Sequence, residues 1–174
     1  MGKAEQPAIK IDKKVDPNDA RHEFNSSITL IERLHQKLHD LLNLVLEEFD
    51  VGEVSAVQAL LIYNLGEYEI MVSELKTRGF YLGSNVSYNL KKLVKLGYVR
   101  QVPSRHDKRA TQVSLTSQGH KVRKIIEDLY KDNIHKILST CPLEYQEIKK
   151  AGEVLRIWDQ FWAQELMEHR KPRF

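Results

Sequence analysis

The stretch LGSNVSYNLKKLVKLGYVRQV, residues 82–102, has a glycine-led opening followed by pairs of apolar and basic residues. It could form a glycine loop that holds a phosphate, or a helix that lies against DNA. On a helical projection the apolar residues fall on one face and every lysine falls on the opposite face. The pattern therefore predicts a helix over residues 84–96 that is ended by Gly97. The apolar face contains Val86, Leu90, Leu93, Val94 and Leu96, and the basic face contains Lys91, Lys92 and Lys95.

The residues around Gly83 disfavour the phosphate loop. A Walker-type loop needs two glycines and a closing Lys-Ser or Lys-Thr pair, and this stretch has neither feature. A recognition helix instead places short polar side chains near base edges and lysines near phosphates. The alternative interpretation is an ordinary surface helix with a solvated lysine face. The candidate DNA-binding residues of this helix are Ser84, Asn85, Ser87, Tyr88, Lys91, Lys92 and Lys95.

Charge is concentrated in the same part of the chain. Residues 83–109 carry seven basic side chains and one acidic side chain, a net charge of +6. The whole chain carries +3, so the remaining residues together carry −3. A basic segment on an otherwise mildly acidic chain indicates a local contact with a polyanion.

The composition is typical of a soluble globular protein, with 41% hydrophobic and 29% charged residues in 174. No apolar run approaches the roughly 20 residues of a membrane span, and the N-terminus has no signal-peptide core. We therefore expect a cytoplasmic protein that makes no membrane contact. The single cysteine, Cys141, excludes an intrachain disulfide, and we expect it to be structural or incidental.

The first half of the chain predicts an arm, a long helix and two short helices. Residues 1–17 are polar and aperiodic, so we expect a flexible arm. Apolar residues then recur every three or four positions over residues 18–50, which predicts one helix long enough to pack against a partner. Ser55 and Gln58 form a capping box for the next helix, and Ser73 is expected to cap a third.

The second half predicts a hairpin and two more long helices. Residues 98–102 and 111–115 alternate as two strands, and the charged segment between them suits an exposed hairpin tip. Thr116 is expected to cap the first of the helices over residues 116–168, and residues 169–174 form a tail. The predicted fold is mainly α with a small β wing: a winged helix-turn-helix at 51–115 flanked by long dimerisation helices.

The hairpin tip and the strand after it, SRHDKRATQVSLTSQG at residues 104–119, resemble the wing signature of MarR-family winged helix-turn-helix regulators. The shared features are the tip Asp107-Lys108-Arg109 and the segment Leu-Thr-x-x-Gly at residues 115–119. The segment 93–99 is similar to the family's step from recognition helix to wing. The order of elements fits the family along residues 18–168.

The resemblance implies a homodimer whose terminal helices intertwine and whose two winged domains bind a palindromic operator in double-stranded DNA. It also implies that a tip arginine enters the minor groove, for which Arg109 or Arg105 is the candidate, with Lys108 beside them. Asp107 would then pair with a wing arginine and brace the tip.

Three positions depart from the family pattern. Gln101 stands where an arginine is frequent, and Arg100 is a candidate substitute from the other strand face. Asn89 stands where the family prefers an apolar residue, and Tyr88 stands where it often has arginine. The last two departures bear on the operator sequence rather than on the fold.

Family members often bind small aromatic effectors between the dimer helices and the DNA-binding domain. Each residue near that crevice is also explained as ordinary core. The candidates for an effector pocket are Leu42, Tyr63, Leu65, Phe80 and Tyr81.

Metal binding and catalysis have little support. His35 and His39 are spaced to face one metal ion, but no third ligand is evident, so we expect neither a metal nor another cofactor. No nucleophile, base and orienting group occur together, so we do not expect an enzyme.

We therefore predict a bacterial MarR-type regulator of transcription that is ligand-responsive, with repression as the expected mode. The alternative is a winged-helix protein-interaction module whose basic face binds an acidic partner without specific DNA binding.

Overall fold

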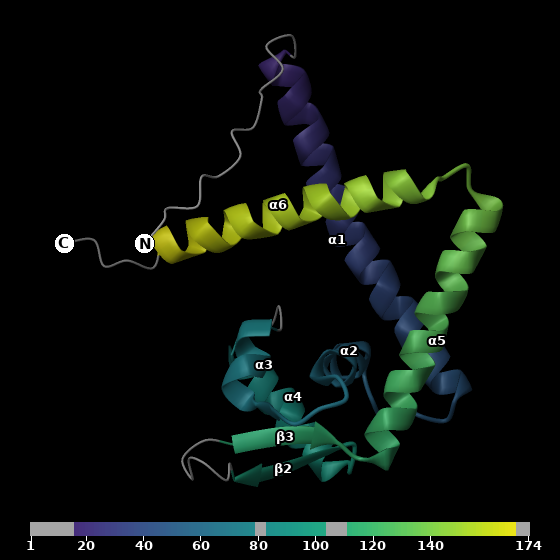
Figure 1. Ribbon diagram of the computed structural model, residues 1–174, viewed down its shortest axis with the longest axis vertical. Helices are drawn as coiled ribbons and strands as arrows, with labels where there is room; N and C mark the ends of the chain where they lie inside the picture. Colours follow the sequence, from purple (N-terminus) through teal and green to yellow (C-terminus); the bar gives the residue numbers. More distant parts are fainter. Residues whose placement is uncertain (1–15, 79–82, 104–110, 170–174) are drawn as a thin grey trace. The chain divides into compact units, whose positions relative to one another are not determined.

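The computed structural model describes residues 16–78, 83–103 and 111–169. The chain divides into two compact units, residues 1–123 and residues 124–174, and one helix, α5, runs from the first unit into the second. The mainly α fold with a small β wing is confirmed (Figure 1). In chain order the elements are α1 (Pro17–Glu48), α2 (Ala56–Leu65), β1 (Ile70–Met71), α3 (Val72–Arg78), α4 (Gly83–Lys95), β2 (Val99–Pro103), β3 (Thr111–Leu115), α5 (Ser117–Thr140) and α6 (Tyr145–His169).

The wing is the outer part of a three-stranded antiparallel sheet with strand order β1-β3-β2. The β2–β3 ladder runs from the pair Val99–Leu115 to the pair Pro103–Thr111. The strand β1 adds the pairs Ile70–Val113 and Met71–Gln112 on the other edge of β3. The sequence predicts only two strands, because a two-residue strand is too short to show alternation.

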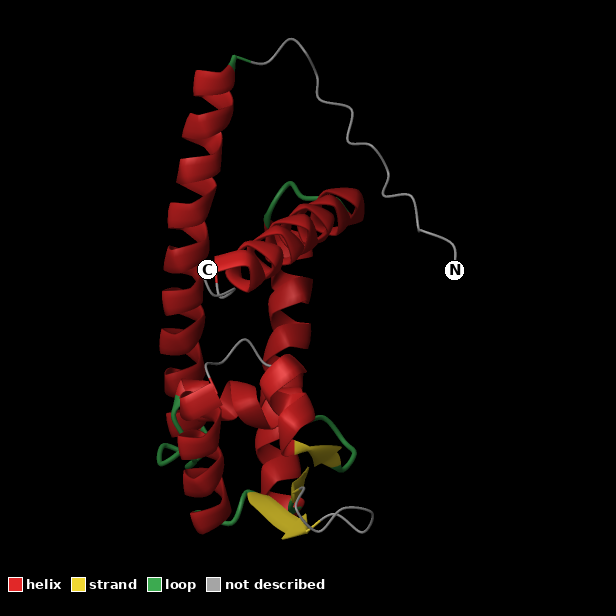
Figure 2. Cartoon of the chain, turned by 90° about the vertical axis from the view of Figure 1, so that its left-hand side faces the viewer, coloured by secondary structure: helices red, strands yellow, loops and turns green. Residues whose placement is uncertain are grey.

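The predicted amphipathic helix forms α4, and its apolar face lies in the core of the first unit. Val86, Leu90 and Leu93 are at most 3% exposed. The helix packs on α2, α3 and β2, and the short helices lie beside the strands (Figures 1 and 2). The small residues Ala56 and Ala59 of α2 are also buried.

Gly97, Tyr98, Thr116 and Gly119 form the junction between α4, the wing and α5. Gly97 adopts a φ of +83°, and the Tyr98 amide donates to the Leu93 carbonyl at 3.0 Å, which ends α4 as a Schellman-type motif. The Thr116 hydroxyl donates to the Gly97 carbonyl at 2.6 Å and accepts from the Gly119 amide at 3.2 Å. Thr116 therefore caps α5 as predicted, and it also fastens α5 to the end of α4.

The starts of α1 and α2 agree with the sequence, whereas α6 begins only at Tyr145, after Pro142, and the start of α3 also differs. Asp16 caps α1 by accepting from the Asn18 amide at 2.8 Å, with proline in the first helical position. The capping box that opens α2 is present. The expectation that Ser73 caps α3 is wrong: the helix begins at Val72, and the Glu74 carboxylate accepts from the Met71 amide at 3.1 Å instead.

The long helices bury few of their side chains within the chain. Only Leu42 and Leu46 are buried among the residues of α1, and none is buried among those of α6. No helix in the described ranges is long and apolar enough to cross a membrane.

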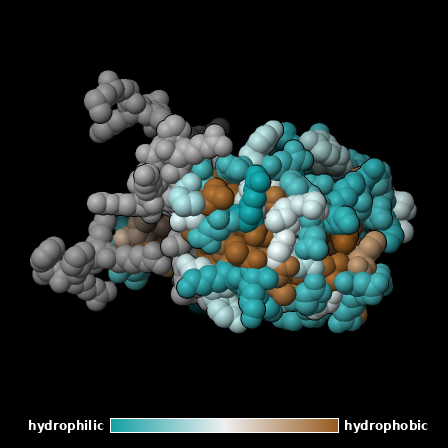
Figure 3. Space-filling view, turned by 90° about the horizontal axis from the view of Figure 1, so that it is seen from below, coloured by the Kyte–Doolittle hydropathy of each residue, from teal (hydrophilic) through white to brown (hydrophobic). Residues whose placement is uncertain are grey.

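The face that is seen when the molecule of Figure 1 is viewed from below is mostly hydrophilic, with hydrophobic residues gathered between the hydrophilic ones (Figure 3).

Candidate nucleic-acid interface

The exposed face of α4 is basic and lies opposite the buried face. Tyr88 is 69% exposed, Lys91 and Lys95 are exposed, and Ser87 and Lys92 are half-buried. Ser84 and Asn85 lie in the first turn of α4, and their side chains lie outside the described part of the structure. The helix contains no acidic residue, so its outer face offers hydrogen-bonding groups and positive charge to an anionic partner.

The structure describes the two strands of the wing but not its tip. The paired residues Pro103 and Thr111 are the last described residues on either side. Arg105, Asp107, Lys108 and Arg109 belong to the segment between them and lie outside the described residues. The minor-groove arginine and the aspartate brace therefore remain predictions.

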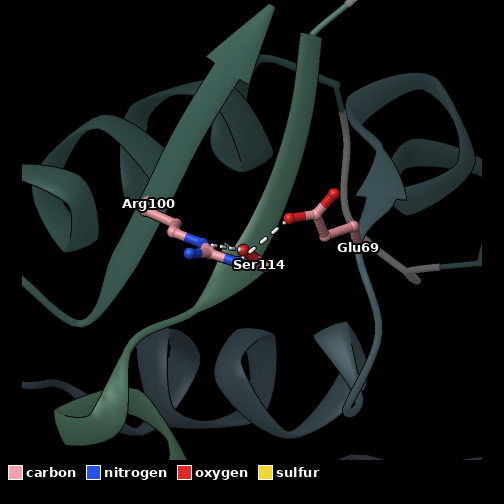
Figure 4. Close-up of polar contacts among 3 residues, drawn as sticks. All are labelled: Glu69, Arg100 and Ser114. Atoms are coloured by element: carbon pink, nitrogen blue, oxygen red, sulfur yellow. Dashed lines mark hydrogen bonds and ion pairs between the residues drawn. The ribbon is translucent and has the colours of Figure 1, made fainter. Parts of the chain in front are cut away.

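At the base of the wing, the guanidinium of Arg100 reaches across β3 (Figure 4). Its Nε donates to Ser114 Oγ at 2.7 Å, and one terminal nitrogen donates to Glu69 Oε1 at 3.0 Å. The three residues come from β2, β3 and the segment before β1, so Arg100 links the whole width of the sheet. The Arg100 and Glu69 side chains are 62% and 47% exposed, and solvent limits such a pair to about 1 kcal/mol or less.

This geometry bears on the role suggested for Arg100 as a substitute for the family arginine. Two of its donors already bind protein acceptors, so its first role in the described structure is to brace the sheet. Glu69 and Ser114 were not identified from the sequence, because their link depends on strand pairing between distant segments.

Gln58 connects α2 to α4. This side chain is 2% exposed, and its Oε1 accepts from the Ser55 amide at 3.1 Å within the capping box. Its Nε2 donates to Asn89 Oδ1 at 3.1 Å. The departure at Asn89 is thereby explained: the asparagine faces a buried amide on the neighbouring helix, where an apolar residue would leave that amide without this acceptor.

Tyr98, at the start of the wing, is 7% exposed and donates its hydroxyl to Glu53 Oε1. Burial, followed by the hydrogen bond to Glu53 and its charge, raises the pKa of Tyr98 to about 12. The same hydrogen bond is the largest cause that lowers the pKa of Glu53. The pair fastens the wing to the loop between α1 and α2.

The residues suggested for an effector pocket have different surroundings. Leu42 and Leu65 are each 1% exposed and belong to the core. Tyr63 is half-buried, and Phe80 and Tyr81 lie outside the described residues. The structure therefore places only Tyr63 of this set at a described, partly exposed position.

The histidine pair and the cysteine lie away from α4 in the sequence. The rings of His35 and His39 are 4.2 Å apart between centroids, and desolvation followed by the charge of His35 lowers the pKa of His39. Within residues 16–78, 83–103 and 111–169, no three His, Cys, Asp or Glu side chains are grouped to hold a metal ion. Cys141 is an exposed free thiol directly after α5.

Comparison with known proteins shows which proteins share this fold. Residues 54–119 match the family described as winged helix DNA-binding domain. A mutant of MarR from E. coli, solved with operator DNA, is 27% identical with a TM-score of 0.63 over 77% of this chain and 94% of that chain. Residues 54–119 therefore form a winged helix DNA-binding domain, and the chain is similar to MarR in sequence and fold. The resemblance inferred from the wing motifs is thereby confirmed.

Two further proteins are similar to this chain. The exopolysaccharide II synthesis transcriptional activator ExpG of Rhizobium meliloti is 32% identical over 107 residues, which cover 62% of this chain and 55% of that protein. The chain thus matches about half the length of that relative. FabT of Streptococcus pneumoniae, solved in complex with DNA, shares the fold, with 18% identity and a TM-score of 0.67 over 81% of this chain and 98% of that chain. ExpG is a transcriptional activator, and MarR and FabT were solved with DNA, so these proteins agree with the sequence in favouring a regulator over an enzyme.

Proposed function

We propose that this chain is a MarR-type regulator that binds a palindromic operator as a homodimer and controls transcription from the adjacent promoter. The observation that carries the proposal is the exposed basic face of α4, opposite a face that is fixed in the core. A helix held in this way by a helix-turn-helix presents its first turns to the major groove and its lysines to phosphates. The operator complex of the 27% identical MarR supports the same use of the fold.

The homodimer is supported by apolar surface that this chain leaves uncovered. The helix α6 has 25 residues and buries none of them, and α1 buries two of its 32. Many large apolar side chains exposed on one helix mark an interaction site, and packing rather than propensity stabilises most helices in water. The large exposed apolar residues of these helices are Phe24, Leu30, Leu34, Leu41 and Leu44 on α1, and Val154, Leu155, Ile157, Phe161, Trp162, Leu166 and Met167 on α6.

A small aromatic effector is the third part of the proposal. Family resemblance supports it, and Tyr63 is the half-buried residue of the suggested pocket set. An effector acts by favouring a separation of the two recognition helices that does not match half-sites about 34 Å apart. A panel of phenolic compounds that leaves the DNA affinity of the wild type unchanged would contradict this part.

The site assignment is tested by mobility shift on fragments that the full-length protein selects from the host's genomic DNA. The double variant Lys91→Ala/Lys95→Ala, and separately Arg109→Ala, should lose most of the binding. Lys149→Ala/Lys150→Ala removes the same charge from α6 as the first variant removes from α4, and it should bind as the wild type does. Specific binding that survives in all the variants would refute the assignment.

The same experiment separates this function from its alternative. A protein that fails to bind any DNA at low salt would instead be an interaction module for an acidic partner. Because a regulator acts on chromosomal DNA, we expect the protein to work in the cytoplasm. A reporter fused to the selected promoter decides between repression, the expected mode, and activation, the activity stated for the Rhizobium meliloti relative.

A further inference from the structure

Two polar side chains among the described residues are buried, Gln58 at 2% exposure and Ser114 at 6%. Ser114 accepts from Arg100 at the base of the wing, and Gln58 binds the recognition helix. A buried polar group is costly unless it is hydrogen-bonded, so each of these positions depends on one geometry of its partner. One buried polar side chain therefore binds α4 from the neighbouring helix, and the other lies within the wing, so each is linked to an element that is expected to contact DNA.

The other buried side chains described on α2 and α4 are apolar. They include Val86, Leu90 and Leu93 of α4 and Ala59 and Ile62 of α2. Apolar side chains of suitable size tolerate shifts and repacking, whereas a hydrogen bond weakens steeply when its distance or angle changes. The link from Gln58 to Asn89 thus adds a directional restraint to a contact that apolar packing leaves less defined.

Gln58 is itself held on its other side. Its Oε1 is fixed by the Ser55 amide, which leaves Nε2 directed at Asn89. The first amide of α2, that of Ala56, donates to Asn43 Oδ1 of α1 at 2.8 Å. A series of side-chain hydrogen bonds therefore runs from α1 through the start of α2 to the middle of α4.

Asn89 lies directly beside the expected DNA-contacting face. Tyr88 precedes it in the chain and is 69% exposed, and Lys92 follows it by three positions. A small rotation or slide of α4 would move these groups relative to base edges. Contacts to phosphates are less sensitive, because lysine side chains are long and flexible.

We propose that Gln58 and Asn89 are positioning residues, which set the register of the recognition helix and thereby the preference for operator over unrelated DNA. Asn43 extends this control to α1, one of the helices that we expect to dimerise. The inference rests on the proposed DNA-binding function and adds to it the residues that determine specificity without touching DNA.

The test is the double variant Gln58→Leu/Asn89→Leu in the full-length protein. The double replacement leaves no unpaired amide between α2 and α4, but it removes the acceptor of the Ser55 amide, so the variant should fold and melt moderately below the wild type. Its affinity for a selected fragment should fall by about tenfold, which is the scale of one mismatched base contact. Its affinity for an unrelated duplex of equal length should not change. Gln36→Leu, which removes the exposed hydrogen bond to Asp40 on α1, is the matched control and should change neither affinity.

Amide hydrogen exchange gives a readout that does not depend on DNA. The amides of α4 should exchange faster in the double variant than in the wild type, because one restraint on the helix is lost. If the double variant does not fold, Asn89→Ser takes its place, since serine remains polar but is too short for the link.

The outcomes distinguish the inference from the function on which it rests. A ratio of specific to unrelated affinity equal to that of the wild type would overturn the positioning role. A wild type that selects no fragment would overturn the proposed function instead, and unchanged exchange in α4 would then overturn the link as a restraint on the helix.

Discussion

Gly119 shows how a single residue connects α4 to the wing and α5. A Cβ at this position would overlap the Tyr98 carbonyl oxygen and come within 3.2 Å of Leu115 Cβ. Both neighbours are firmly placed, because Tyr98 and Leu115 are buried and the Tyr98 carbonyl accepts from the Thr116 amide. The glycine of the Leu-Thr-x-x-Gly segment is therefore required by backbone contact.

Gly119→Ala should lower the free energy of unfolding by about 1–3 kcal/mol, the usual cost of overpacking. Gly152→Ala is the matched control, because its Cβ meets only the flexible end of Arg156 at 3.5 Å. That change should be neutral or stabilise by about 0.5–1 kcal/mol, as alanine generally does within a helix. Urea unfolding of both variants is the measurement, and equal effects would contradict the proposed contact.

Tyr98 gives a pH-dependent prediction at the same scale. An unfolded tyrosine titrates near 10.0, whereas the pKa of Tyr98 is raised to about 12 in the folded protein. Between these values the unfolded chain releases a proton that the folded chain retains, so the free energy of unfolding falls as the pH rises. The stabilisation is fully present below pH 10 and lost as the pH passes about 12.

Phenolate absorbance during an alkaline titration measures the ionisation of Tyr98 directly. One of the seven tyrosines should ionise later than an exposed tyrosine, and Tyr98→Phe should remove that late step. Glu53→Gln should lower the pKa of Tyr98, because the hydrogen bond and the charge of Glu53 both raise it. The Tyr98 pKa should still stay above 10.0, since burial is the larger cause. A late step that persists in Tyr98→Phe would contradict the assignment.

At the scale of elements, most of the first unit could be predicted from local patterns. The period of apolar residues predicted α4 and its buried face, and the motif ending in Gly119 predicted the start of α5. The strand β1 could not be predicted, since its two residues gain their conformation only by pairing with β3. Local propensity carries too little information in so short a segment.

The candidate site was predictable to a similar extent. The spacing of Lys91 and Lys95 indicated their shared exposed face, which the structure confirms. The second hydrogen bond of Gln58 could not be inferred, because the capping box accounts only for its contact with Ser55. The link to Asn89 joins residues 31 positions apart and depends on how α2 packs on α4.

At the scale of the whole molecule, the uncovered helices α1 and α6 predict a stable dimer. Light scattering should give twice the 20.3 kDa of one chain. Leu155→Asp/Phe161→Asp introduces charge into the exposed apolar surface of α6 and should shift the mass toward one chain and weaken operator binding. Gln160→Asp adds a charge at an exposed polar position on the same helix and should leave the mass unchanged. A wild type with the mass of one chain would contradict the homodimer.

The central claim is that the lysines of α4 neutralise DNA phosphates. It is tested most directly by the slope of affinity against salt concentration, for the wild type and for Lys91→Ala/Lys95→Ala, on one selected fragment between about 50 and 200 mM salt. Each lost phosphate contact should reduce the slope by about one, so the double variant should have a slope lower by about two. Equal slopes for the two proteins would show that these lysines do not meet the DNA backbone, and would contradict the assignment of α4 as the recognition helix.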